Sequence, residues 1–479
     1  MKKFVIKGGN KLQGEVKVAG AKNAALKVLV AACLTDEKVI IHNVPLISDF
    51  FVMLDIIKEL GGQVELTGHS VTVQMQKFRQ SSIPLDEAAL VRASSMFIAP
   101  LLVRTGEAII PNPGGCRLGA RPIDRTIEGI SHMNVDITYH SEDGYFHAKP
   151  HGDNLGVRPI DRTIKGLEHL GTTVNYHPES RSYHVKGSFI KGTNYHFEKN
   201  THTGTETMIL AAVLAEGTTI LTNAAEEPEI DDLINLLNQM GAKVTRSGIR
   251  EITIVGVEKL HGTEFTISPD RIEVVTFAIA AVVTGGDVLI KDAQKASIDA
   301  FLEKYKQTGA GLEIKSDGIR FFAMGTLNAV DITTAIHPGF MTDWQAPWAV
   351  LMTQAKGNSI IHETVFENKL GYVEDLKKMG AHAILFNPEV KNPEELYNFN
   401  LEDDSPSYFH AVEIKGPTAL HNAVMTTLDI RAGAAIVIAA LAARGTSTIF
   451  GVEKLDRGYE HLEKRLEKLG ADIKRVEHE

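Results

Sequence analysis

The sequence predicts an α/β protein of two domains, each built from three copies of one repeated unit. A module in which an Ala-rich helix ends at a small or polar residue, before a β-branched strand, occurs six times. The chain has 479 residues, which is enough for two or three hydrophobic cores at about 100–200 residues each. Two domains of three units, with an active site between them, form the simplest arrangement. A repeat solenoid without catalysis is less expected, because the conspicuous polar residues stand at particular unit junctions.

The spacing of these modules defines the units. Their helices end at Asp36, Gly106, Gly217, Gly285, Gly357 and Gly445. Glycine is typical of this position because it adopts the left-handed conformation that ends many helices. Successive ends are 70, 111, 68, 72 and 88 residues apart, so three of the five steps are close to 70. The pattern predicts six units with two insertions.

A second module supports this count. It is an amphipathic helix with apolar residues at i, i+3 and i+4, which ends in Leu-Gly or Met-Gly before a strand. Its clearest copies end at Gly61, Gly241, Gly380 and Gly470. We expect one domain at 22–268 and a second domain formed by 1–21 and 269–479.

Each domain contains one of the insertions. Arg-Pro-Ile-Asp-Arg-Thr-Ile occurs at 121–127 and again at 158–164, displaced by 37 residues. This repeat predicts a duplicated helix–strand segment in the first domain. The 88-residue step contains a segment near 387–407 that is rich in Pro, Asn, Glu and Asp, which is typical of a surface loop.

Composition excludes several classes of protein. The formal net charge of −10 argues against a broad nucleic-acid surface. Two cysteines exclude a disulfide framework and a multi-thiolate metal cluster, and they suit a reducing cytoplasm. The longest apolar stretch, 432–443, is shorter than the about 20 residues of a bilayer span. No metal-binding or cofactor-binding motif occurs, so we expect no metal or cofactor. We also expect a cytoplasmic monomer.

A Gly-rich loop contains the more suggestive cysteine. Cys116 is flanked by glycines, and Arg117 and Arg121 nearby would favour its thiolate and lower its pKa. A thiol in this setting is a candidate acid or nucleophile, and the alternative is an inert exposed thiol. Cys33 lies within Val-Ala-Ala-Cys-Leu, and we expect it in the core.

Cations stand at the ends of several predicted elements. Lys22 and Asn23 begin a small-residue helix, and a helix N-terminus favours anions. Guanidinium groups bind carboxylate and phosphate groups through two parallel hydrogen bonds. The predicted cluster therefore contains Lys22 together with Arg92, Arg121, Arg431 and Arg457. Each of these alone is commonly a member of a surface ion pair.

Two further segments suit catalysis and binding. Asp343 stands at a turn before an apolar helix, where it is either an N-cap or a general base directed between the domains. The segment 199–207 precedes a helix predicted at 208–214. Its hydroxyl groups suit a diphosphate or a sugar, and a capping box is the alternative.

Jointly, these motifs resemble the enolpyruvyl transferase family. They are Ala-Lys-Asn-Ala-Ala-Leu at 21–26, Gly-Gly-Cys at 114–116 with Gly-Ala-Arg-Pro at 119–122, Glu-Pro-Glu-Ile at 227–230, Pro-Asp-Arg-Ile-Glu at 269–273, Pro-Gly at 338–339 with Thr-Asp at 342–343, Phe-Glu-Asn at 366–368 and Asp-Arg-Gly-Tyr-Glu at 456–460. The resemblance covers about residues 4–476 apart from the insertions. It implies two inside-out α/β domains of three repeats each.

The resemblance also implies a reaction. Enolpyruvyl passes from phosphoenolpyruvate to the 3′-hydroxyl of UDP-N-acetylglucosamine with release of phosphate, as the first committed step of peptidoglycan synthesis. Cys116 matches the loop cysteine that protonates phosphoenolpyruvate and is alkylated by fosfomycin, and Asp343 matches the residue proposed to accept the hydroxyl proton. Residues matching the phosphoenolpyruvate cluster are Lys22, Arg92, Arg121 and Arg457, with Asp429 and Arg431 as a nearby acid–base pair. Residues matching UDP-sugar contacts are Asn23, Arg121, Pro122, Ile123, Asp124, Lys199, Thr201, His202, Thr203 and Val365.

The sequence departs from the family pattern at several positions. Lys369 stands where an arginine is usual, which replaces a bidentate contact by a point charge. Met341 replaces a usual proline, and Thr-His-Thr at 201–203 replaces a usual Ser-Val-Gly. The two Arg-Pro-Ile-Asp copies are both candidates for one sugar-contacting segment, and we favour the first because it is tethered to Cys116.

Two other functions fit less well. A 5-enolpyruvylshikimate-3-phosphate synthase has the same fold, but it lacks the loop cysteine and has Ser and Arg around the lysine. A non-catalytic homologue that binds UDP-sugar and regulates the pathway is the other alternative. Intact Cys116, Asp343, Lys22 and Arg457 argue against it.

Overall fold

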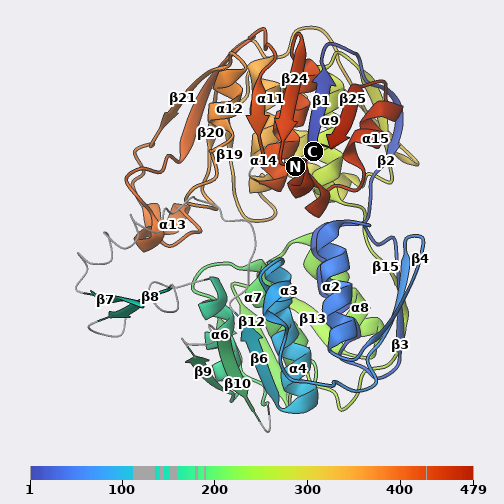
Figure 1. Cartoon of the computed structure of the whole chain (residues 1–479), viewed down its shortest axis with the longest axis vertical. Helices are drawn as coiled ribbons and strands as arrows, with labels where there is room; N and C mark the ends of the chain where they lie inside the picture. Colours follow the sequence, from blue (N-terminus) through green and yellow to red (C-terminus); the bar gives the residue numbers. More distant parts are fainter. Residues whose placement is uncertain are drawn as a thin grey trace.

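In the computed structural model, six of the seven β-sheets formed by the described residues follow one pattern, five of them completely. Figure 1 shows the elements divided between two halves of the molecule. In the five four-stranded sheets, an edge strand runs parallel to its neighbour and the other two pairs are antiparallel. In the sixth sheet, which has three strands, a parallel bridge between Ser82 and Ile109 stands where the edge strand would be. The structure describes residues 2–111, 135–140, 145–150, 159–177, 182–187, 190–427 and 429–477.

One hydrophobic core is formed by residues between Ala21 and Ile267, and we call the elements around it the first lobe. Its helices are α1 (Lys22–Ala32), α2 (Ser48–Glu59), α3 (Leu85–Ala88), η1 (Arg92–Phe97), α4 (Ile98–Thr105), α6 (Pro159–His169), α7 (His202–Ala212) and α8 (Pro228–Gln239). Its strands are β3 (Lys38–His42), β4 (Gln63–Thr67), β5 (Ser70–Gln74), β6 (Glu107–Pro111), β9 (Thr173–His177), β10 (Ser182–Lys186), β11 (Asn194–His196), β12 (Thr218–Thr222), β13 (Lys243–Gly248), β14 (Glu251–Val255) and β15 (Glu264–Thr266). They form the sheets β15-β3-β5-β4, β6-β10-β9 and β11-β12-β14-β13.

A second core is formed by residues 4–18 together with residues 272–473, and we call its elements the second lobe. Its helices are α9 (Arg271–Val283), η2 (Lys295–Ile298), α10 (Asp299–Gln307), η3 (Thr342–Trp344), α11 (Gln345–Thr353), α12 (Val373–Lys378), α13 (Pro393–Leu396), η4 (Leu401–Asp403), α14 (Ile430–Ala442), η5 (Val452–Arg457) and α15 (Leu462–Lys468). Its strands are β1 (Lys2–Lys7), β2 (Gln13–Lys17), β16 (Asp287–Lys291), β17 (Gly311–Lys315), β18 (Gly318–Phe322), β19 (Ile332–Thr333), β20 (Gly357–His362), β21 (His382–Phe386), β22 (Ala411–Gly416), β23 (Val424–Thr426), β24 (Thr446–Phe450) and β25 (Asp472–Glu477). They form the sheets β17-β18-β16-β2, β19-β20-β22-β21 and β23-β24-β1-β25.

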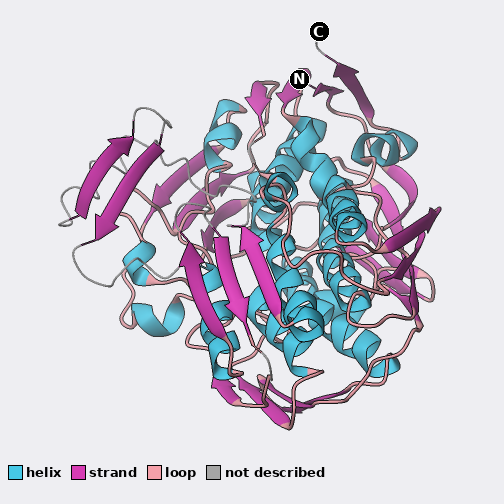
Figure 2. Cartoon of the chain, turned by 60° about the horizontal axis from the view of Figure 1, so that its bottom comes forward, coloured by secondary structure: helices cyan, strands magenta, loops and turns pink. Residues whose placement is uncertain are grey.

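Helices fill the interior of each lobe, and the sheets lie outside them (Figure 2). Every residue of α1 except Asn23 is buried, as is every residue of α9 except Val283. Strands such as β3 alternate between buried and exposed residues, because only one face of each sheet packs on helices. The predicted inside-out α/β fold is therefore confirmed. Among the described residues, no helix combines the length and apolar character needed to cross a membrane.

The glycines that predicted the repeats lie between a helix and the strand that follows it. Gly106 caps α4 and Gly285 directly follows the C-cap of α9, whereas Gly217, Gly357 and Gly445 lie beyond the C-cap and border or begin the next strand. All five glycines of the first module have positive φ, from 67° at Gly285 to 118° at Gly357. A residue with a Cβ would be strained in this left-handed conformation, whereas glycine is not. The six-unit prediction was correct because a left-handed glycine recurs between the helix and the next strand in five of the six units.

The duplicated segment contributes differently in its two copies. The second copy forms α6, β9 and β10, and β10 joins the three-stranded sheet by antiparallel pairing with β6. Strands β7 (Val135–His140) and β8 (Tyr145–Pro150), which follow the first copy, form a separate two-stranded sheet. The first copy of the motif itself, at 121–127, lies outside the described residues. The second copy thus completes the second repeat of the first lobe.

The chain crosses between the lobes twice, side by side. Gly20 and Pro269 form an antiparallel bridge, which is flanked by hydrogen bonds from Ala21 N to Ser268 O at 2.8 Å and from Asp270 N to Ala19 O at 2.8 Å. A side chain at Gly20 would collide with the backbone carbonyl of Asn43, so the close approach requires glycine. These crossings place the starts of α1 and α9 next to each other.

Candidate active site

Basic side chains from both lobes meet at the junction. Lys22 Nζ, from the start of α1, lies 2.8 Å from Asp49 Oδ2, and Arg457 Nε, from the end of η5, lies 2.7 Å from Asp49 Oδ1. The Asp49 side chain is only 4% exposed. One buried carboxylate in α2 therefore holds a cation from each lobe. We call Lys22, Asp49, Arg431 and Arg457 the cation cluster.

The pKa of Lys22 is lowered mainly by burial, with a further contribution from neighbouring cations. Burial lowers the pKa of Lys22, and the charges of Arg431 and Arg457 lower it further, while Asp49 raises it. The net direction is downward from the ordinary lysine value. Cations that depress each other in this way favour an added anion, because the anion relieves their mutual repulsion.

Arg431 is held in the first turn of α14. The carboxylate of Asp429 caps this helix by accepting the backbone N–H groups of Arg431 and Ala432, both at 2.9 Å. The Arg431 guanidinium lies over the Tyr459 ring, 5.1 Å from its centroid. Its Nη1 atom is buried and has no hydrogen-bond partner among the described residues. A buried guanidinium donor of this kind is available to an anionic ligand.

Asp343 is an ionised carboxylate beside this cluster. Its Oδ1 lies 3.4 Å from Lys369 Nζ. Burial opposes ionisation of Asp343, but the charges of Lys369, Arg431 and His202 outweigh burial and lower its pKa. His202 belongs to the first lobe, so the Asp343 carboxylate faces charged groups of both lobes. An ionised carboxylate in this position is able to accept a proton.

A buried carboxylate organises the backbone around Asp343. Glu363 accepts hydrogen bonds from Thr342 Oγ1 at 2.7 Å and Gln345 Nε2 at 2.9 Å. It also accepts the backbone N–H groups of Val365 at 2.7 Å and Phe366 at 3.0 Å. Glu363 thereby fixes the residues around Asp343 relative to the half-buried Val365.

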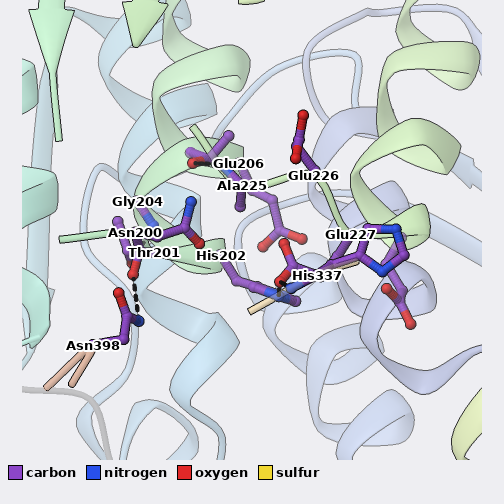
Figure 3. A network of polar contacts seen from close by, with 12 residues as sticks. Asn200, Thr201, His202, Gly204, Glu206, Ala225, Glu226, Glu227, His337 and Asn398 are labelled. Atoms are coloured by element: carbon purple, nitrogen blue, oxygen red, sulfur yellow. Dashed lines mark hydrogen bonds and ion pairs between the residues drawn. The ribbon is translucent and has the colours of Figure 1, made fainter. Parts of the chain in front are cut away.

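The start of α7 forms a second polar group at the junction (Figure 3). Thr201 Oγ1 accepts the Gly204 N–H at 3.3 Å, so the helix begins at His202 and not at 208 as predicted. His202 Nε2 lies 2.7 Å from Glu227 Oε1, which also accepts the backbone N–H of His337, from the second lobe, at 3.3 Å. Thr201 is therefore an N-cap, but the capping box is not formed, because the N3 residue is Gly204 and has no side chain to return the hydrogen bond. This cap leaves His202 in contact with the junction.

Charge pairing dominates this second group. Burial lowers the pKa of His202, but the Glu227 carboxylate outweighs burial and raises it. Burial raises the pKa of Glu227, but His202 outweighs it and lowers that pKa to about 2. Arg271 forms two hydrogen bonds with the buried Glu229, at 2.9 and 3.0 Å. We call the pairs His202–Glu227 and Arg271–Glu229 the paired network.

The structure brings together most of the predicted residues that it describes. Lys22, Arg431, Arg457, Asp343 and Lys369 interact electrostatically, and Thr201 to Thr203 lie at the adjoining start of α7. Arg92 begins η1 with an exposed side chain, and no described residue links it to the cation cluster. Cys33 is buried in the core, as predicted. Five predicted residues lie outside the described ranges: Cys116, Arg121, Pro122, Ile123 and Asp124.

Sequence reasoning missed Asp49, which holds the cation cluster together. The available signal was that Asp49 lies on the apolar stripe of α2, four residues before Met53 and seven before Ile56, where it is buried. Glu227 and Glu229 were noted only as part of a family motif, without partners. Within the described part of the chain, no three His, Cys, Asp or Glu side chains are grouped to hold a metal ion.

Solved structures define the class of protein. The enolpyruvyl transferase NikO from Streptomyces tendae superposes with a TM-score of 0.79 and 21% identity, covering 100% of this chain and 99% of that chain. EPSP synthase from Acinetobacter baumannii gives a TM-score of 0.72 with 17% identity, covering 100% of both chains. The fold is therefore that of the enolpyruvyl transferases.

Sequence comparison shows the family. The family model described as EPSP synthase (3-phosphoshikimate 1-carboxyvinyltransferase) matches residues 6–152 and 150–466. UDP-N-acetylglucosamine 1-carboxyvinyltransferase of Acidobacterium capsulatum is 37% identical over 99% of this chain and 96% of that protein. The corresponding protein of Methylacidiphilum infernorum is 38% identical over 99% of both. The chain belongs to the enolpyruvyl transferase family, among the UDP-N-acetylglucosamine 1-carboxyvinyltransferases.

Proposed function

We propose that the protein transfers the enolpyruvyl group of phosphoenolpyruvate to the 3′-hydroxyl of UDP-N-acetylglucosamine and releases phosphate. The observation that carries this proposal is the cation cluster next to the ionised Asp343, in a chain with whole-length relatives of that name. Phosphoenolpyruvate has a carboxylate and a phosphate, and both need cations. The acceptor hydroxyl needs a base.

Each of the proposed catalytic residues has a separate role in the reaction. Lys22, Arg431 and Arg457 bind the two anionic groups of phosphoenolpyruvate and stabilise the charge that develops on addition. Asp343 accepts the proton of the attacking hydroxyl. Cys116 supplies a proton to the methylene carbon, which becomes a methyl group, and one proton of that methyl group is removed when phosphate leaves. The resemblance alone assigns this role to Cys116, and it makes fosfomycin an expected inhibitor.

The nucleotide sugar occupies the adjoining surface. The start of α7, with Lys199 and Thr201 to Thr203, faces its diphosphate, because backbone N–H groups and an ammonium favour phosphate. Asn23, Val365 and Lys369 complete the sugar contacts from the two lobes. We also propose that Arg92 and Asp429 bind substrate. For the Arg-Pro-Ile-Asp segment we propose the first copy, Arg121 to Asp124, which is tethered to Cys116.

The wider role follows from this reaction. We propose a monomeric cytoplasmic enzyme of peptidoglycan synthesis, and hence of cell-wall formation and cell division, that needs no metal or cofactor. The alternative function, that of an EPSP synthase, shares the fold. The solved EPSP synthase from Acinetobacter baumannii, however, is only 17% identical to this chain. The alternative predicts shikimate 3-phosphate as the acceptor.

Phosphate release from phosphoenolpyruvate tests the proposal. Purified protein without added metal should release phosphate with UDP-N-acetylglucosamine and not with shikimate 3-phosphate. Cys116→Ser should lower the rate by at least about a hundredfold, because the proton donor at carbon is weakened, whereas the buried Cys33→Ser should retain turnover. Binding of the nucleotide sugar without turnover would favour the regulatory homologue. Equal losses in the two variants would overturn the role of Cys116.

A further inference from the structure

The polar segment at 387–407 reaches from the second lobe to the first. Lys199 Nζ donates to the backbone carbonyl of Glu394, in α13, at 2.7 Å and to that of Tyr397 at 3.0 Å. The Glu394 carboxylate lies 3.7 Å from the same ammonium. Three oxygen atoms of one segment therefore surround the head group of a lysine from the other lobe.

Asn398 makes a second connection next to this lysine. Its side-chain amide donates to the backbone carbonyl of Asn200 at 3.1 Å (Figure 3), and Asn200 is buried. Its backbone N–H donates to the carbonyl of Thr364 at 2.8 Å. Asn200 precedes Thr201, and Thr364 precedes Val365. Asn398 therefore joins the two backbone segments, one from each lobe, that border the proposed nucleotide-sugar site.

The segment is anchored on the second lobe. Tyr397 is buried, and its hydroxyl lies 3.1 Å from His362 Nε2 of β20. Its ring lies 4.8 Å from that of Phe399 and 5.1 Å from that of His410. This aromatic packing fixes the carbonyls that hold Lys199, which a loop without side-chain packing would not do.

We propose that this segment is a positioning and specificity element of the nucleotide-sugar site, in which Asn398 aligns the two lobes and Glu394 weakens anion binding. The inference rests on the proposed function. A lysine ammonium has three donors, and two are used by backbone carbonyls, so one remains for a phosphate oxygen. The Glu394 carboxylate is close enough to repel a diphosphate placed there.

Two substitutions should therefore act in opposite directions. Asn398→Ala should raise the KM for UDP-N-acetylglucosamine about tenfold, with kcat and the KM for phosphoenolpyruvate nearly unchanged, because it removes a hydrogen bond that aligns the binding surface. Glu394→Gln should lower the same KM about twofold to fivefold at low salt, because it removes a like charge. The effect of Glu394→Gln should disappear at high salt, since exposed charges are screened.

The matched control is Glu395→Gln in the same helix. The Glu395 carboxylate accepts the side-chain amide of Asn392 at 3.1 Å, and no interaction connects it to Lys199 within the described ranges. This control should leave both KM values unchanged. Thermal unfolding of each variant identifies any loss of fold, and Glu394→Gln keeps the test decisive should Asn398→Ala unfold.

Calorimetric binding of UDP-N-acetylglucosamine to the same full-length proteins separates the two proposals. Turnover by the wild type with unchanged KM and Kd in both variants would overturn the role of the segment. Binding without turnover would overturn the proposed function, and opposite Kd shifts in the variants would still support the segment. A wild type that binds no UDP-N-acetylglucosamine would overturn both.

Discussion

The cation cluster and the paired network both lie at the junction of the lobes, but their charges are arranged differently. In the cation cluster, Lys22 and Arg457 share one carboxylate, that of Asp49. In the paired network, His202 and Arg271 each have a carboxylate of their own. Three cations around one carboxylate favour an added anion, whereas removing one partner of a buried pair leaves an uncompensated charge and destabilises the folded protein. The comparison separates the cations proposed to bind phosphoenolpyruvate from the ion pairs that hold the junction together, and of these pairs His202–Glu227 also borders the proposed nucleotide-sugar site.

The largest expected effect is on catalysis by the cation cluster. Arg457→Met should lower kcat/KM for phosphoenolpyruvate by about a thousandfold, because it removes a charge-assisted contact to substrate. Phosphate-release kinetics would measure it. The control is Arg475→Met, since Arg475 pairs with Asp456 and Glu463 in the same lobe. Similar losses of kcat/KM in the two variants would remove the distinction between substrate-binding and structural arginines.

The paired network should respond mainly in stability. Arg271→Met should lower the free energy of unfolding by about 3 kcal/mol, because it leaves the buried Glu229 carboxylate without its partner. Urea denaturation would measure this loss. Adding Glu229→Gln should recover part of it, since the two residues interact directly. A stable Arg271→Met protein with lost turnover would instead place Arg271 in the substrate site.

The smallest effect is a pH dependence in the same network. Glu227 raises the pKa of His202 above its unfolded value, so the stabilisation is present below about pH 6.5 and is lost as pH rises through the raised pKa. The stability difference between the wild type and His202→Gln should therefore shrink above neutral pH. Urea denaturation across this range would measure it. A difference that grows with pH would contradict the assigned charge state.

The sequence could predict the repeats because they depend on local chemistry. The connections at Gly217 and Gly285, between a helix and the next strand, contain a left-handed residue, and that requirement is visible in any single unit. The start of α7 was predicted too late, because Thr201 caps the helix with polar residues that resemble a loop. A capped helix start and a polar loop therefore look alike in sequence.

The sequence could predict which residues belong to the candidate site, but not which residues they contact. Lys22 and Arg457 were recognised as motif residues, but their common partner Asp49 is 408 residues from Arg457 and belongs to a helix that looks like core. The polar segment at 387–407 was expected to be a surface loop, yet its contact with Lys199 spans the lobes. Such pairings depend on how distant units pack, which no local pattern encodes.

The central claim is that this junction attaches an enolpyruvyl group to a nucleotide sugar. Mass spectrometry of UDP-N-acetylglucosamine after incubation with phosphoenolpyruvate and the full-length protein tests it most directly. The account predicts that each acceptor molecule gains one enolpyruvyl group for each phosphate released, and that a 3′-deoxy analogue gains none. An unmodified acceptor, or transfer to shikimate 3-phosphate in its place, would contradict the account.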